Sequence, residues 1–207
     1  MKLHFSRAGH RAVAIMAGTA IAALAITSAA FAATSSGASP GSGAAHVASA
    51  AIPRCAAAVG QNGNVSVWVA DDQGNGAAGT IYYPLEFTNL SKHACSMYGF
   101  PGVSVISRSG KQLGSPASWA SGGGFGTPRT VIVAAGATVH AILAYHDAEV
   151  STAPGCDAVN TAVQLRVYPP DQRSAAYAFF DLEACSHAGP VYLSVGPIKA
   201  GVGTING

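Results

Sequence analysis

IYYPLEFTNLSKHACSMYGFPGV, residues 81–103, is the stretch that decides the fold. Its first half alternates, and successive strand residues point to opposite faces of a sheet, so one set faces a core and the other faces outward. The predicted inward set is Ile81, Tyr83, Leu85 and Phe87, and the outward set is Thr80, Tyr82, Glu86 and Thr88. Pro84 falls on the outward set, and its missing N–H indicates a strand edge or a bulge. The stretch therefore predicts a core strand, a turn, a corner at Cys95 and the start of another strand.

The chain from residue 52 to about residue 200 shows the same short-range pattern. Apolar and polar residues alternate in short runs separated by Gly, Pro, Asn and Asp, without an apolar stripe of helical period. About eight strands are predicted, at residues 65–69, 80–88, 102–107, 130–134, 138–145, 163–167, 176–182 and 191–195. This spacing predicts an all-β, immunoglobulin-like sandwich of two sheets, with a small closed barrel as the alternative. Residues 114–128 are predicted to form a long loop that is either mobile or functional.

The first 32 residues have the three parts of a secretory signal peptide. Lys2, Arg7 and Arg11 form a basic region, an apolar run of about 15 residues follows, and AFA at 30–32 places small residues where signal peptidase cleaves. An N-terminal membrane anchor is the alternative, but the run is shorter than the roughly 20 residues that span a bilayer. We therefore predict a signal peptide at 1–32, a flexible leader rich in Ala, Ser, Gly and Pro at 33–51, a domain at 52–200 and a tail at 201–207.

Removal of the signal peptide changes the charge balance. The full chain has 11 Lys+Arg and 9 Asp+Glu, and residues 1–32 hold three of the basic residues and none of the acids, which leaves 8 against 9 and a net charge of −1. A near-neutral chain without a Lys/Arg cluster has no electrostatic footprint for nucleic acid. We expect an exported protein, extracellular or associated with the cell wall, with no transmembrane segment after cleavage. No cysteine directly follows the apolar run, so a lipid anchor is not expected.

Four cysteines lie in the predicted mature part: Cys55, Cys95, Cys156 and Cys185. An even number in an exported protein indicates disulfides, and the absence of any C-x-x-C pair argues against a zinc site. Four cysteines allow three pairings. We favour Cys55–Cys95 with Cys156–Cys185, because each bridge then closes a loop within one half of the domain. Each bridge is expected to stabilise the fold by roughly 3–4 kcal/mol in the chain-entropy model.

Several of these segments together resemble a known family. The most specific is CSMYGFPGV at 95–103, which follows the turn at Thr88-Asn89; the others are LEFTN at 85–89, the turn at Ser109-Gly110, AGAT at 135–138, LRVYPP at 165–170 and the four cysteines. From Cys55 to about Ile198 the chain is similar to the secreted actinobacterial family catalogued as domain of unknown function 4232. The resemblance implies a secreted or surface-attached β-sandwich with two disulfides. It implies no activity, because the family has none assigned.

Motifs for catalysis, cofactors and metals are weak in this sequence. DDQGNG at 71–76 resembles the start of a calcium loop, but the twelfth position is Tyr82 instead of Glu, and a polar hairpin turn fits better. His140 and His146 are expected to lie roughly 20 Å apart along one strand, too far to share a metal. No Gly-x-Ser-x-Gly elbow, phosphate-binding loop or evident carboxylate pair occurs. We predict no catalytic, cofactor or metal residue and expect that the protein is not an enzyme.

Aromatic residues outside the predicted core are the candidates for a binding surface. Trp68, Tyr82, Tyr168 and Tyr192 are predicted to point outward from strands, and Trp119 and Phe125 lie on the predicted long loop. The candidate binding surface is made of these residues except Tyr168. Exposed aromatic side chains can form a platform for a sugar, a peptide or a protein, although some of these could instead pack under the loop. We predict a monomeric, non-catalytic module that binds a glycan or protein partner at the cell envelope. A secreted hydrolase or a metal-carrying protein is the alternative.

Overall fold

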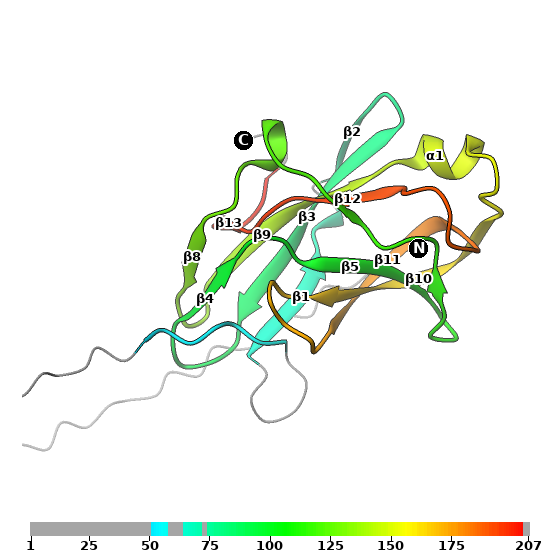
Figure 1. Ribbon diagram of the computed structural model, residues 1–207. Helices are drawn as coiled ribbons and strands as arrows, with labels where there is room; N and C mark the ends of the chain where they lie inside the picture. Colours follow the sequence, from blue (N-terminus) through cyan, green and yellow to red (C-terminus); the bar gives the residue numbers. More distant parts are fainter. Residues whose placement is uncertain (1–50, 58–63, 72–73, 205–207) are drawn as a thin grey trace, which may run out of the picture. The chain divides into compact units, whose positions relative to one another are not determined.

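The structure, a computed structural model, describes residues 51–57, 64–71 and 74–204 (Figure 1). The predicted signal peptide and nearly all of the predicted leader lie outside these residues. In chain order the elements are β1 (Val65–Val69), β2 (Asn75–Ala77), β3 (Thr80–Asn89), β4 (Cys95–Tyr98), β5 (Gly102–Ser107), β6 (Gln112–Leu113), β7 (Ser118–Trp119), the 3-10 helix η2 (Gly123–Phe125), β8 (Thr130–Val133), β9 (Thr138–Tyr145), α1 (Asp147–Thr152), β10 (Ala158–Tyr168), β11 (Ala176–Cys185), β12 (Leu193–Val195) and β13 (Lys199–Ala200).

The strands form a seven-stranded sheet, a four-stranded sheet and a separate pair. The seven-stranded sheet has the order β1-β3-β9-β12-β7, with β2 paired to β3 and β13 paired to β9; the four-stranded sheet has the order β11-β10-β5-β6, and β4 pairs with β8. Both larger sheets contribute to a single hydrophobic core, for example Leu85 from β3 and Leu165 from β10. The predicted all-β fold is confirmed. The described residues contain five strands beyond the predicted eight: β2, β6, β7 and β13 have only two or three residues each, and the four-residue β4 lies at the predicted corner at Cys95.

β3 is paired on both sides, with β1 and β9, and its predicted inward residues lie in the core or against it: Ile81, Tyr83, Leu85 and Phe87. Pro84 therefore lies in an inner strand rather than at the edge of the sheet. Its carbonyl accepts a hydrogen bond of 3.0 Å from the backbone N–H of Ala70. In a strand the N and the C=O of one residue face the same neighbour, so the missing N–H faces the gap after Val69 and before Asn75. Pro84 thus lies where pairing is interrupted.

Two disulfides join Cys55 to Cys95 and Cys156 to Cys185, which are the pairs favoured from the sequence. The first attaches the segment that enters the domain to β4, where the backbone N–H of Cys55 also donates to the carbonyl of Ser96. The second attaches the segment before β10 to the end of β11. Each bridge therefore closes its own half of the domain.

The outer face of the seven-stranded sheet is covered by the C-terminal segment. β13 pairs with β9, and residues 201–204 continue over β3 and β9. The backbone N–H of Gly203 donates to a carboxylate oxygen of Glu86 at 2.7 Å, and Nδ1 of His140 is 2.8 Å from the carbonyl oxygen of Gly201. Glu86 points away from the core as predicted, but it has no exposed surface. The predicted domain end at residue 200 is therefore too early, because Gly203 is buried.

Residues 114–128 do not form the predicted unstructured loop. The backbone N–H of Ala117 donates to the carbonyl of Val103 in β5, and two residues later Trp119 pairs with Val195 in β12. This segment therefore passes from the four-stranded sheet to the seven-stranded sheet, and η2 follows it. Its Gly- and Ser-rich composition gave no indication of this pairing, because the pairing depends on residues far along the chain.

Candidate functional site

An aromatic cleft of about 520 Å³ lies beside the beginning of β5 and the end of β10. We use the name "aromatic cleft" for the hollow lined by Tyr98, Phe100, Trp119, Pro128, Tyr168, Pro169, Asp171 and Gln172, with the backbone of Gly99 and Gly102. The volume is within the range of small-molecule binding sites.

One wall of the aromatic cleft comes from the corner between β4 and β5. Tyr98 ends β4 and is half exposed. Gly99 has a φ of 92°, a backbone conformation that residues with a Cβ rarely adopt, and its carbonyl accepts a hydrogen bond of 2.9 Å from the backbone N–H of Ile198. This turn places Phe100 against the indole of Trp119. The local sequence YGFPG therefore builds the corner that positions both rings.

Trp119 is exposed but held in place. Its ring stacks on Phe100 with a centroid distance of 5.3 Å and an interplanar angle of 13°. Its backbone is paired with Val195 in β12, and the N–H of Ala120 donates to the carbonyl of the same residue at 3.0 Å. The side chain nevertheless keeps 68% of its surface exposed. A large flat apolar surface is thus presented to solvent in one orientation.

The opposite wall comes from the turn between β10 and β11. The backbone N–H of Gln172 donates to the carbonyl of Pro169 at 3.0 Å, and Asp171, at the third turn position, has a φ of 57°. Proline second and a positive φ third are features of a type II turn, in which Gly or Asn is usual at the third position. Arg54 forms an ion pair with Asp171. The charged side chain that lines this cleft is therefore already paired.

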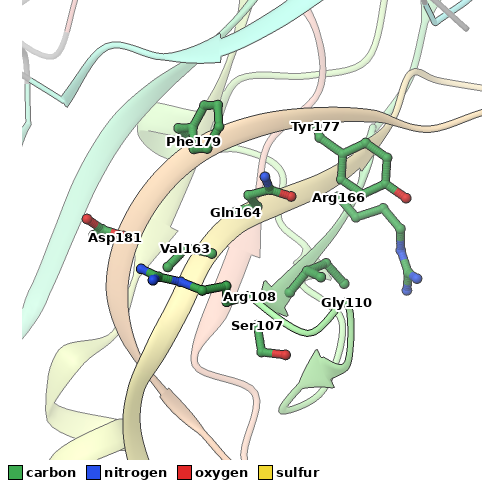
Figure 2. A pocket seen from close by; sticks show the side chains of 10 residues that line it. Ser107, Arg108, Gly110, Val163, Gln164, Arg166, Tyr177, Phe179 and Asp181 are labelled. Atoms are coloured by element: carbon green, nitrogen blue, oxygen red, sulfur yellow. The ribbon is translucent and has the colours of Figure 1, made fainter.

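A second hollow, of about 570 Å³, lies on the outer face of the four-stranded sheet (Figure 2). We call it the sheet hollow; it is lined by Ile106, Ser107, Arg108, Gly110, Val163, Gln164, Arg166, Tyr177, Phe179 and Asp181. Figure 2 shows Arg108 and Asp181 toward one end, Tyr177 and Arg166 toward the other, and Gln164 between them. Phe179 is 82% exposed, the most exposed large apolar side chain among the described residues.

The five residues predicted to form one binding surface are not brought together. Trp119 lies in the aromatic cleft on β7, whereas Trp68 is on β1, at the other end of the strand order, where its Nε1 lies 3.3 Å from Oγ1 of Thr88. Four strand spacings separate them, on the order of 19 Å. Tyr82 and Phe125 contact each other edge to face, with centroids 6.1 Å apart, and both are half buried.

The prediction that Tyr192 points outward is wrong. Tyr192 has no exposed surface, and its hydroxyl donates to the carbonyl of Leu113 at 2.9 Å. A Cβ on Gly114 would collide with its ring, so the segment leaving β6 packs directly on it. Burial raises the pKa of this phenol far above its usual value. Tyr192 precedes β12 instead of alternating within it, and this is why the strand pattern failed here.

Tyr98, Phe100 and Tyr168 line the aromatic cleft with Trp119. The sequence predicted that Tyr168 points outward but did not place it in the binding surface, and Tyr98 and Phe100 were not selected. A signal for them was present in the sequence. All three belong to the segments on which the family resemblance rests, CSMYGFPGV and LRVYPP. Those segments were interpreted as parts of the fold, and the structure places their aromatic side chains around one hollow.

His140 and His146, the two histidines of β9 and its end, are engaged in structural contacts. In His146, Nδ1 is 2.9 Å from Oγ1 of Thr80, and Nε2 is 3.1 Å from Oγ of Ser194. His140 is buried, and burial lowers its pKa. Among the described residues, no three His, Cys, Asp or Glu side chains gather in a way that could hold a metal ion. The calcium-loop possibility falls partly on residues 72–73, outside the described part.

Comparisons with known proteins agree on the family and add no activity. A family model described as Domain of unknown function (DUF4232) matches residues 55–199. No curated protein and no solved structure matches the chain. In the part of the chain that the structure describes, no helix is long and apolar enough to cross a membrane.

Proposed function

The chain belongs to this family of unknown function, as its sequence segments predicted, and we propose that it is a non-catalytic module that binds a glycan of the cell envelope in the aromatic cleft. Two disulfides in one domain are consistent with an extracellular protein. In the proposed complex, a neutral sugar ring lies flat on the indole of Trp119.

The observation that carries the proposal is the exposed and immobilised indole of Trp119. The exposed surface of this indole is available to a partner, and its stack on Phe100 orients the ring before any ligand arrives. A sugar ring has a C–H face that fits such a flat surface. Fixing the surface beforehand reduces the ordering cost of binding.

The rim of the aromatic cleft supplies groups that suit sugar hydroxyls. Tyr98 and Tyr168 carry phenol hydroxyls that both donate and accept, and Gln172 carries an amide that does the same. Asp171 is paired with Arg54, so neither charge is available without breaking an ion pair. This balance favours an uncharged sugar over an ionic ligand in this cleft.

The test is binding of the purified protein to linear glucan and mannan hexasaccharides, measured by titration calorimetry. Trp119→Ala is expected to weaken binding about 30-fold, because truncating a central aromatic anchor typically costs about 2 kcal/mol. Trp68→Ala is the matched control, since Trp68 is also an exposed tryptophan but lies on β1. Equal affinity of both variants and wild type would refute the cleft as the site.

A proline-rich peptide is the competing ligand, because such peptides also dock on aromatic grooves. A polyproline decapeptide is therefore titrated in parallel with the sugars. Binding of that peptide to wild type but not to Trp119→Ala, with no response to any sugar, would overturn the glycan proposal and keep the cleft as a binding site.

A further inference from the structure

The aromatic cleft and the sheet hollow lie along the same outer face, and one pair of residues joins them. Tyr168 lines the cleft and Arg166 lines the hollow; they are two residues apart on β10, and the guanidinium carbon lies 5.9 Å from the centre of the tyrosine ring. Side chains two apart on a strand point the same way. The two hollows are therefore adjoining parts of a single surface.

Arg166 is a fixed part of this surface. One terminal nitrogen of its guanidinium donates to the amide oxygen of Gln112 in β6 at 2.6 Å, and the group lies over Tyr168. β10 pairs Arg166 with Ser104 on one side and with Tyr177 on the other. The side chain therefore spans the middle of the four-stranded sheet.

The far end of the sheet hollow carries free charges of both signs. Within the described residues, neither Arg108 nor Asp181 takes part in an ion pair, and both are exposed. With Arg166 the hollow has two cations and one anion, which is a local excess of positive charge in a domain that has few charges. This differs from the aromatic cleft, where the one charge is already neutralised.

We propose that the surface binds a linear glycan bearing carboxylates, with a neutral sugar on Trp119 in the aromatic cleft and a uronate in the sheet hollow facing Arg108. This inference rests on the proposed function and extends it to a second subsite. A guanidinium matches a carboxylate in charge and in planar shape. The exposed rings of Tyr177 and Phe179 would line the path between this uronate and the aromatic cleft.

The length of the surface requires a chain rather than a single sugar. Tyr168 and Gln164 are four residues apart on β10, which corresponds to roughly 13 Å. Phe179 pairs with Gln164, and Asp181, at the far end of the hollow, lies two residues further along β11. A ligand that touches both ends must therefore contain several sugar units.

The negative charge of Asp181 favours a uronate over a phosphate-rich polymer as the ligand of the sheet hollow. Its carboxylate only accepts hydrogen bonds, so it suits the hydroxyls that accompany each uronate on a sugar ring. A polymer with a phosphate in every unit would place a second negative charge beside Asp181. The charge pattern of the hollow therefore fits sparse carboxylates on a polyhydroxylated chain better than dense phosphates.

The experiment compares each linear hexasaccharide with its C6-oxidised form, which has the same backbone and carries carboxylates. The protein has two tryptophans, so in a Trp68→Phe background the fluorescence of Trp119 alone reports binding. We expect the oxidised form to bind about 10-fold more tightly, the order of one charge-assisted hydrogen bond, and the preference to shrink with added salt.

Arg108→Gln is expected to abolish this preference, because the oxidised form loses the guanidinium that faces its carboxylate. Lys92→Gln is the matched control, since it removes one exposed positive charge from the turn between β3 and β4. An unchanged preference in Arg108→Gln, or tighter binding of poly(glycerol phosphate) than of the oxidised sugar, would overturn the inference.

The two proposals fail in different ways. Neutral sugars that bind through Trp119 without any preference for the oxidised form refute the second subsite alone. Binding of the oxidised form, measured by titration calorimetry, that depends on Arg108 but keeps its full affinity in Trp119→Ala supports the sheet hollow and refutes the aromatic cleft.

Discussion

The two outer faces of the domain differ in what covers them. On the seven-stranded sheet, the chain's own residues 199–204 cover β3 and β9 and bury Glu86 and His140. On the four-stranded sheet, nothing among the described residues covers the rings of Tyr177 and Phe179, which are mostly exposed. The part of the seven-stranded sheet around Glu86 and His140 is thus covered, whereas the outer face of the four-stranded sheet is open.

This difference is the opposite of what the free energies of burying polar and apolar side chains favour. Burying a carboxyl costs free energy unless its hydrogen bonds are met, and in the described structure one oxygen of Glu86 has no partner. Exposing a phenylalanine forgoes the stabilisation that burial would add. An outer face that keeps its aromatic side chains exposed is suited to binding, and for this reason we place the ligand on the four-stranded sheet and on the adjoining Trp119 of β7.

The largest expected effect comes from opening the covered face. A Cβ at Gly203 would lie 2.5 Å from Cβ of Pro84 and 2.9 Å from Cγ of His140. We expect Gly203→Ala to lower the free energy of unfolding by about 2 kcal/mol, because the backbone must move away from both groups. Urea denaturation measures this change.

Gly124→Ala is the control for the loss of a glycine. A Cβ there meets no atom within 4 Å, and the stability should change by less than about 0.5 kcal/mol. Equal stability of Gly203→Ala and wild type would show that residues 201–204 do not hold the face closed.

The next effect is on the pH dependence of stability. Burial raises the pKa of Glu86 above 4.5, although the hydrogen bond from Gly203 opposes this. Between pH 4.5 and the raised pKa, the folded protein keeps a proton that the unfolded chain has lost, so stability falls as the pH rises through this window. Glu86→Gln should remove that fall and raise stability at pH 8 by about 1 kcal/mol.

His140 provides the opposite pH dependence. Burial lowers its pKa below 6.5, so the unfolded chain binds a proton that the folded protein does not, and stability falls as the pH drops from 6.5. His140→Asn should remove only this acid-side loss. Denaturant midpoints between pH 4 and 9 separate the two residues, and a Glu86→Gln profile parallel to that of wild type would contradict the role of the buried carboxyl.

The smallest effect is expected on the open face. Phe179→Ser should change the free energy of unfolding by less than about 0.5 kcal/mol, because the ring is 82% exposed and contributes little to the core. The mirror substitution, Phe180→Ser on the same strand, should cost several-fold more, since Phe180 is buried and packs edge to face on Tyr83 at 4.8 Å. Similar losses of unfolding free energy for the two variants would indicate that the ring of Phe179 is covered in solution.

Much of the fold could be predicted from local pattern. The alternation in β3 placed Leu85 and Phe87 in the core, because side-chain direction in a strand depends only on neighbouring residues. The cysteine pairing followed from loop lengths. Two-residue strands such as β6 and β7 were not predicted, since two residues cannot show an alternating pattern.

The candidate site was predicted only in part. Trp119 was selected correctly as exposed, but its stacking partner Phe100 was not selected. Tyr168 was predicted to point outward without being placed in the binding surface, and Tyr192 was assigned to the surface although it is buried. Its hydroxyl bonds to a carbonyl 79 residues away in the sequence. No local pattern contains that contact.

Chain sequence alone thus settled which residues alternate, which cysteines are available and which face of each strand is apolar. Contacts between distant segments settled which outer face is closed: the hydrogen bond that buries Glu86 joins residues 117 positions apart. The physical reason is how far apart along the chain the residues that determine each property lie. Side-chain direction follows from the backbone of one strand, whereas coverage depends on where another part of the chain ends its path, and in this protein that path covers Glu86 and His140 and leaves the outer face of the four-stranded sheet open.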